Sequence, residues 1–142
     1  MREILKQLSQ LAIEIGEEQI VFSSEQIDSE WIGFEPTLDT EINMAEEKLK
    51  IKLPKEYKRF LMITNGFSQS EITEPEFFSI DKIDWLINFD KNLVDIYSEN
   101  DKKFGKLLKR AIIVADPNNE QQFLLIPPEK NEDWKFWKFA NW

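Results

Sequence analysis

The sequence contains no cysteine and no histidine, and these two absences exclude much of the chemistry found at active sites. Without cysteine the chain can form neither a disulfide nor a thiolate metal site. Without histidine it lacks Ser–His and Cys–His nucleophile systems, an imidazole general base and the usual zinc ligands. Glycine is scarce as well, and none of the 4 glycines lies in a phosphate-cradling loop. The sequence therefore points away from nucleophilic hydrolases and from nucleotide-binding loops.

Long apolar runs and positive net charge are also missing. The longest apolar run, residues 111–115, is far short of the ~20 residues that a helical membrane span requires. The first residues, MREILKQL, lack the apolar region of a secretion signal, so we expect a cytoplasmic protein. The net charge is −9. A charge of this sign disfavours binding to nucleic acid or to an anionic membrane and favours a basic partner.

The order of the predicted elements indicates an α+β fold. The length of 142 residues fits one domain over residues 1–142, large enough to bury a proper core. Residues 2–15 predict an amphipathic helix with an apolar face of Ile4, Leu8, Leu11 and Ile15, widened by neighbouring apolar residues. Because helices come first and strands later, we expect N-terminal helices packed on a mostly antiparallel, mixed β-sheet.

The strands of that sheet are predicted mainly in the last third of the chain. Residues 111–115 and 122–126 predict a hairpin around a turn at residues 116–119. A third strand at 134–139 changes its apolar phase between Phe136 and Trp137, which indicates a bulge or burial on both faces. Residues 77–80 predict a short strand after a mobile loop at 67–76, whereas 83–86 and 93–97 predict helices.

Residues 41–66 predict two helices separated by a tight break. Thr40 is a predicted N-cap of the first helix, which ends at Leu53 because Pro54 disfavours helical geometry in the preceding residue. Pro54 then suits the first turn of the second helix, and Gly66 suits its left-handed cap. The lysines of this stretch read as a solvated basic face rather than a phosphate-binding strip, because the overall field is acidic.

Other candidate sites have plainer structural interpretations. Asp116, Asn118 and Glu120 alternate as in a calcium loop, but Gln121 and Pro127 stand where that loop requires glycine and glutamate, so a turn is favoured. Five tryptophans could form a sugar or base platform, although core packing is their usual role. Carboxylate pairs suited to glycoside hydrolysis arise by chance among 27 acidic residues.

Residues 69–101 contain many acidic residues and few basic residues to balance their charge. This segment is either a solvated face or the surface that meets a basic partner, and in the second interpretation its acids are the candidate partner-binding residues. They are Glu71, Glu74, Glu76, Asp81, Asp84, Asp90, Asp95, Glu99 and Asp101.

A family resemblance rests on two ordered motifs, W-x-G-x-x-P and I-x-x-x-E-x-x-L-x-x-x-L-P-x-x-Y-x-x-F-L-x-x-x-N-G. Together they resemble the SUKH superfamily, the Smi/Knr-type domain, over residues 31–66. The later strands match less specifically. The motif residues are Trp31, Gly33, Pro36, Ile42, Glu46, Leu49, Leu53, Pro54, Tyr57, Phe60, Leu61, Asn65 and Gly66.

The sequence departs from this family in two places. Pro117-Asn118-Asn119 stands where an Asp-Gly turn is common, and the closing helix that often follows the last strands is missing. The second departure, with a terminal Trp142 directly after a strand-like run, suggests a trimmed chain. The motif residues have structural roles in the family, and we expect the same of Glu46, at the edge of an apolar face.

What the resemblance implies is a non-enzymatic domain without catalytic residues, metal or cofactor. Bacterial members are largely immunity proteins that bind and neutralise toxins, often nucleases, of polymorphic toxin systems. Fungal relatives regulate cell-wall synthesis. We therefore expect an immunity protein whose acidic surface meets a basic toxin. A regulatory or scaffold protein with an endogenous partner, and a carboxylate-based sugar hydrolase, are the alternatives.

Overall fold

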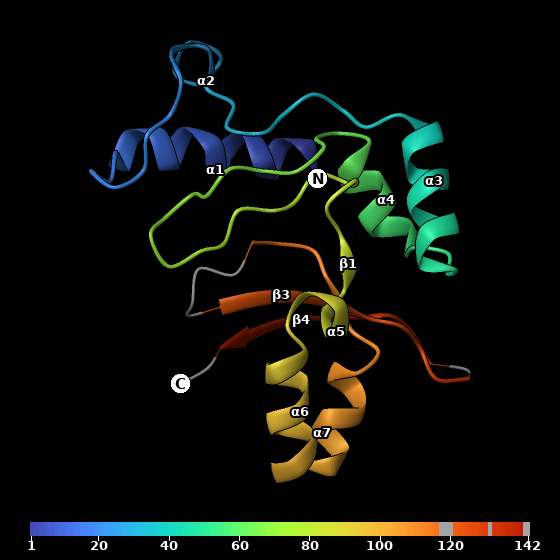
Figure 1. The fold of residues 1–142 in the computed structure, drawn as a ribbon. Coiled ribbons are helices and arrows are strands. Elements are labelled where there is room, and N and C mark those ends of the chain that lie inside the picture. The colour runs from blue at the N-terminus through green and yellow to red at the C-terminus, as the bar shows by residue number, and fades with distance from the viewer. Residues whose placement is uncertain (117–120, 131, 141–142) are drawn as a thin grey trace.

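The computed structural model describes residues 1–116, 121–130 and 132–140, and Figure 1 shows their arrangement. Four helices come first: α1 (Arg2–Ile15), α2 (Ser24–Ser29), α3 (Asp39–Leu49) and α4 (Lys55–Leu61). Three more, α5 (Leu86–Phe89), α6 (Lys91–Asn100) and α7 (Lys102–Leu108), lie between the first two strands. The strands are β1 (Asp84–Trp85), β2 (Ile112–Ile113), β3 (Gln121–Ile126) and β4 (Lys135–Ala140). The predicted α+β class is confirmed.

The four strands form one sheet in the order β1-β2-β3-β4, and every pair is antiparallel. Strand β3 is buried along its whole length, which explains its nearly continuous apolar sequence. The pairing of β3 with β4 runs without interruption from Gln121 opposite Ala140 to Ile126 opposite Lys135. The bulge predicted in β4 is therefore absent from the described strand, and Phe136 remains 54% exposed.

Helices cover both faces of the sheet (Figure 1). On one face, α6 and α7 pack through Tyr97 and Phe104 onto Phe139, and Phe104 also stacks on Trp137 with ring centroids 5.3 Å apart. On the other face, Phe123 contacts Phe77, which in turn contacts Phe60 of α4. Neighbouring residues of β3 and β4 point to opposite faces, so both layers of helices share this one sheet.

Two predicted elements have a different structure because long-range pairing overrides the local pattern. Residues 84–85 form β1 and pair with Ile112 and Ile113, so the helix predicted for residues 83–86 begins only at Leu86. The strand predicted at 77–80 is reduced to isolated bridges at Phe77. The predicted turn at 116–119 and the calcium-loop alternative fall mainly on residues 117–120, outside the described part of the chain.

The break between α3 and α4 is confirmed, but its end points are not those predicted. Helix α3 begins at Asp39 with Leu38 as its N-cap, so Thr40 is not the cap, and it ends at the left-handed residue Lys50. Helix α4 follows Pro54 and ends at Leu61, well before Gly66. Gly66 instead adopts its left-handed conformation in the loop that follows.

Helix α1 has the predicted bounds but buries a different face. Its buried residues are Ser9 and Ala12, whereas Ile4, Leu11 and Ile15 are strongly exposed. The reason is a hydrogen bond that sequence periodicity does not reveal. The Ser9 hydroxyl accepts from the buried N–H of Ile32 at 3.2 Å and donates to a carbonyl of its own helix. Small residues let α1 approach that segment closely.

Candidate functional site

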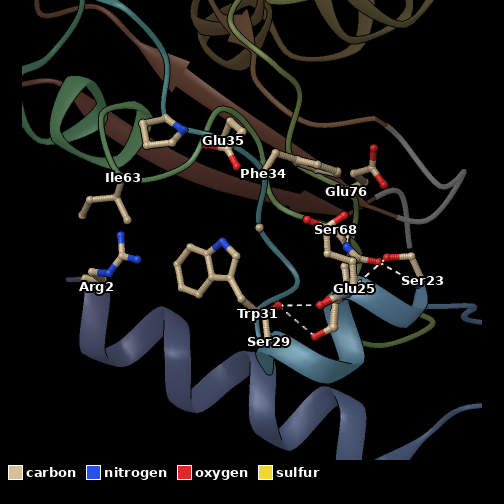
Figure 2. A pocket seen from close by; sticks show the side chains of 13 residues that line it. Arg2, Ser23, Glu25, Ser29, Trp31, Phe34, Glu35, Ile63, Ser68 and Glu76 are labelled. Carbon is tan, nitrogen blue, oxygen red and sulfur yellow. Dashed lines mark hydrogen bonds between the residues drawn. The ribbon is translucent and has the colours of Figure 1, made fainter.

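The candidate site is an open pocket of about 820 Å³ between α1, α2 and the loops at residues 31–36 and 63–76 (Figure 2). Its floor is formed by aromatic and apolar side chains that include Trp31, Phe34 and Ile63. Three carboxylates and a single cation line it. These are Glu25, Glu35, Glu76 and Arg2. The charged side chains thus sum to −2, in keeping with the net charge of −9 for the whole chain.

Trp31 organises the aromatic part of the pocket. Its ring meets Phe67 edge-on, with centroids 5.8 Å apart, and this contact anchors Trp31 to the small core under α1. The guanidinium of Arg2 lies 5.2 Å from the centroid of the same ring, within cation–π range. Figure 2 shows Arg2 and Ile63 on one side of Trp31 and Glu25, Ser68 and Glu76 on the other. The pocket thus holds one basic side chain on an aromatic face beside carboxylates.

The α2 wall is held by a capping box. The Ser23 hydroxyl accepts from the Gln26 N–H, and the Gln26 side chain accepts from the Ser23 N–H. The side-chain Nε2 of Gln26 also donates to Ile32 O at 3.2 Å and to Ser68 Oγ at 3.0 Å, which joins α2 to both loops. Glu25 is consequently presented at the pocket by a fixed first turn.

The opposite wall depends on Thr64 and Gly33. The Thr64 hydroxyl accepts from the Phe34 N–H at 2.7 Å and donates to the carbonyl of Gly66. A Cβ at Gly33 would lie 2.5 Å from the Thr64 hydroxyl oxygen, so only glycine permits this approach. The Asn65 N–H donates to Glu35 O at 2.9 Å. These contacts fix the backbone beneath Phe34 and Glu35, so the pocket is preformed.

Glu76 is the pocket carboxylate with a perturbed pKa. Although Glu76 is exposed at the rim of the pocket, partial desolvation raises its pKa, the nearby Lys82 opposes this effect, and Asp116 adds to it. The charged carboxylate is therefore destabilised in the free protein relative to an ordinary glutamate. A cation placed beside it would relieve that cost.

Replacing Glu76 by glutamine tests this point. Because its pKa is raised in the folded protein, the glutamate costs stability as the pH rises through that pKa. We expect Glu76→Gln to melt at a slightly higher temperature than the wild type at neutral pH, because solvent screens much of the charge of this exposed group, with the difference disappearing below about pH 4. Thermal melts followed by circular dichroism across this pH range would measure it. A variant that is less stable than the wild type at neutral pH would contradict the expectation.

Of the acidic residues predicted to meet a partner, Glu76 alone lines this pocket. Several others have local structural roles. Asp90 caps α6 by accepting from the Leu93 N–H, and Asp101 caps α7 by accepting from two backbone N–H groups. Asp81 accepts from the Ser79 hydroxyl. The acidic character of residues 69–101 thus arises in part from helix capping.

Others of these acids form ion pairs. Glu74 pairs with Lys138, Asp95 pairs with Lys91, and Asp84 lies 3.9 Å from Lys48. Within the described residues, no side-chain hydrogen bond or ion pair involves Glu71 or Glu99. The predicted segment therefore does not form one acidic surface that is free of internal pairing.

Sequence reasoning missed Glu25 and Glu35, which come from other parts of the chain. Two local signals were available: the Ser23-x-x-Gln26 capping box that positions Glu25, and the W-x-G-x-x-P motif that contains Glu35. Neither signal places these residues in one pocket with Glu76, because that arrangement depends on the long-range contact between Gln26 of α2 and Ser68.

The remaining motif residues build the framework. Five are buried in the main core: Ile42, Leu49, Leu53, Tyr57 and Leu61. Phe60 packs against this core, and the Asn65 side-chain oxygen accepts from the Ile80 N–H at 2.7 Å. Pro36 lines the pocket.

Glu46 is a buried carboxylate that ties α3 to α4. It accepts from the Leu53 N–H at 2.9 Å, from Lys52 at 2.7 Å and from Lys58 at 3.1 Å. Burial alone would raise the pKa of Glu46, but these donors together outweigh it and the pKa lies below its usual value. Glu46 therefore closes the break between the two helices as an ionised group.

Two chemical possibilities find no support in the described residues. Among residues 1–116, 121–130 and 132–140, no group of three or more acidic side chains is placed to hold a metal ion. Within the same residues, no helix is both long enough and apolar enough to cross a bilayer.

A single antiparallel sheet with helices on both faces, together with the break between α3 and α4 that Glu46 closes, defines an α+β domain. The sequence of residues 36–142 matches the SMI1/KNR4 family (SUKH-1), and the chain belongs to this family. A comparison with curated proteins finds no match. The family match begins at Pro36, so α1, α2, Trp31 and Gly33 precede it.

Proposed function

We propose that this protein is a non-catalytic immunity protein that binds and neutralises a basic bacterial toxin, most simply a nuclease. The observation that carries the proposal is the pocket at Trp31, which three carboxylates line together with an aromatic ring that already accommodates one guanidinium. Membership of the SUKH-1 family and the net charge of −9 support it. We place the action in the cytoplasm, where a nuclease meets its substrate.

The proposed mechanism is occlusion. A nuclease that binds phosphates presents lysine and arginine side chains in its substrate groove. One such side chain would enter the Trp31 pocket, lie against the aromatic floor and pair with Glu35 or Glu76. Relief of the destabilised Glu76 carboxylate would contribute to binding, and the negative charge of the whole molecule would accelerate encounter. The toxin would be inhibited because its groove is occupied.

The adjacent reading frames provide the test. The protein encoded beside this gene should arrest growth when expressed alone and should be harmless when this chain is co-expressed. The purified pair should form a 1:1 complex whose association slows as salt is raised. Binding instead to a resident protein of the same cell, without any toxic neighbour, would favour the regulatory or scaffold alternative.

Charge reversal tests whether the pocket is the contact surface. We expect Glu35→Lys/Glu76→Lys to slow association with the neighbouring toxin by about tenfold or more at low salt. The matched control is Glu47→Lys/Asp133→Lys, which changes the net charge equally on exposed positions of α3 and of the segment before β4. Surface plasmon resonance would measure both variants. Equal slowing in both would show that only overall charge matters and would remove the pocket from the interface.

A further inference from the structure

The outer side of α1 carries an apolar stripe that the fold leaves uncovered. Its members keep between 36% and 69% of their surface in contact with solvent, although large apolar residues at helical spacing are usually buried. They are Met1, Ile4, Leu8, Leu11 and Ile15. Their spacing alternates between three and four residues along the whole helix. That alternation is the seam on which a second helix packs in a coiled coil.

The stripe is distinct from the face with which α1 contacts its own domain. That face is made by Leu5, Ser9 and Ala12, which lie against Ile32 and Phe67. At about 100° per residue, Lys6 is on the opposite side of α1 from the stripe. Lys6 holds the end of α2 by donating to Ser29 O at 2.6 Å. Neither contact covers the stripe, so it is available to another molecule.

The charges beside the stripe indicate what kind of molecule fits. Its solvent-facing border is formed by Glu3, Gln7, Gln10 and Glu14, which include acids and amides but no base. The two cations of α1 lie elsewhere, with Arg2 over Trp31 and Lys6 at the end of α2. An antiparallel second copy would place acidic borders against each other. An anionic membrane would be repelled, since interfacial helices carry lysine and arginine beside the apolar face.

We propose that α1 is a docking surface for an amphipathic helix of a partner protein, whose apolar seam is bordered by lysine or arginine. Apolar side chains fill the stripe, and the basic border pairs with Glu3 and Glu14. This surface lies before the segment matched to the family. It is also separate from the Trp31 pocket, and the two proposals can fail independently.

The test uses two synthetic fluorescent peptides of about 20 residues, long enough to form helix. They share one leucine–isoleucine heptad seam and differ only in having lysine or glutamate at the bordering positions. Fluorescence anisotropy with the full chain should show the lysine peptide binding about tenfold tighter or more at low salt, with the difference shrinking at high salt. Equal affinities for the two peptides would overturn the proposal.

Variants locate the binding site. Leu8→Glu/Leu11→Glu should weaken binding of the lysine peptide by about tenfold or more, because it places charge in the middle of the seam. The milder Ile4→Gln/Ile15→Gln should give a smaller loss, and it keeps the test valid if the first variant unfolds. Met44→Glu/Met62→Glu alters two exposed methionines elsewhere and serves as control. Unchanged binding in both stripe variants would exclude α1.

Further measurements distinguish the proposed partner helix from other occupants of the stripe, and the stripe from the Trp31 pocket. Self-association of the wild type, abolished by Leu8→Glu/Leu11→Glu in sedimentation equilibrium, would identify a second copy as the occupant and refute the proposal. Binding to phosphatidylcholine–phosphatidylglycerol vesicles that the same variant abolishes would refute it in favour of a membrane. The pocket variant Glu35→Lys/Glu76→Lys should retain its affinity for the lysine peptide, whatever its effect on the toxin. A loss there equal to that of the stripe variants would assign the peptide to the pocket.

Discussion

Replacing Glu46 by alanine is expected to lower the free energy of unfolding by about 3 kcal/mol. The substitution leaves the buried N–H of Leu53 without its acceptor and removes the counter-charge of Lys52 and Lys58. It also removes the group that holds α3 against the start of α4. For a domain of this size the melting temperature should fall by about 10 °C. Urea denaturation and thermal melting would measure the two quantities.

The effect of Glu46→Ala should depend on pH in a defined direction. Because the pKa of Glu46 is lowered in the folded protein, ionised Glu46 stabilises the fold above its unfolded pKa. That contribution is lost as the pH falls through the lower, folded value. The wild type and the variant should therefore differ most near neutral pH, and the difference should become smaller below about pH 4, where only the hydrogen bond to Leu53 remains.

Two further variants separate the roles of charge and hydrogen bonding at Glu46. Glu46→Gln keeps an acceptor for Leu53 and should lose less stability than alanine. Glu56→Ala removes an exposed ion pair with Arg59 in the neighbouring helix and should cost less than about 1 kcal/mol. If Glu46→Ala were no more destabilising than Glu56→Ala, the buried carboxylate would not be holding the break closed.

Replacing Gly105 by alanine is expected to destabilise the protein by about 2 kcal/mol, against the usual helical preference. Alanine normally favours a helix interior by about 1 kcal/mol over glycine. Here a Cβ at position 105 would lie 2.5 Å from the Cα of Ser98 in α6. That neighbour is backbone and cannot rotate away, so α6 and α7 would have to separate and disturb Tyr97 and Phe104 above the sheet.

The matched control for Gly105 is Lys106→Ala, an exposed substitution in the same helix that should change stability by less than about 0.5 kcal/mol. Urea denaturation followed by tryptophan fluorescence would compare the two. Trp137 stacks on Phe104, so it reports directly on this helix pair. An increase in stability for Gly105→Ala would show that the helices accommodate the added methyl group without separating.

The elements that local chemistry determines could be predicted from the sequence. Pro54 stands directly before α4, at the helix start that proline tolerates, and the runs at 122–126 and 134–139 form adjacent strands. Elements fixed by distant contacts could not. Residues 84–85 become a strand only because Ile112 and Ile113 lie opposite them. The buried face of α1 depends on a distant group, the N–H of Ile32, which donates a hydrogen bond to the Ser9 hydroxyl.

The candidate site was harder to predict than the fold for the same reason. Trp31 was expected to pack on the core, and it does contact Phe67, but its ring also faces a pocket together with Arg2. The acidic segment was identified by its charge, yet much of that charge serves to cap helices or to form ion pairs. Glu25, Glu35 and Glu76 come from three separate segments and line one pocket because long-range contacts, such as the Gln26–Ser68 hydrogen bond, bring these segments together.

Helix α1 contributes to both proposed binding surfaces, the apolar stripe and the Trp31 pocket. The helix has the uncovered stripe on one side, and its first turn carries Arg2, whose guanidinium lies over the ring of Trp31. A partner that shifted α1 would therefore also shift the Arg2 guanidinium relative to Trp31, while the hydrogen bond from the Ile32 N–H to Ser9 holds the middle of the helix in place. If such a shift changed the affinity of the pocket for its ligand, thermodynamic reciprocity would require that ligand to change the affinity of the α1 partner by the same factor.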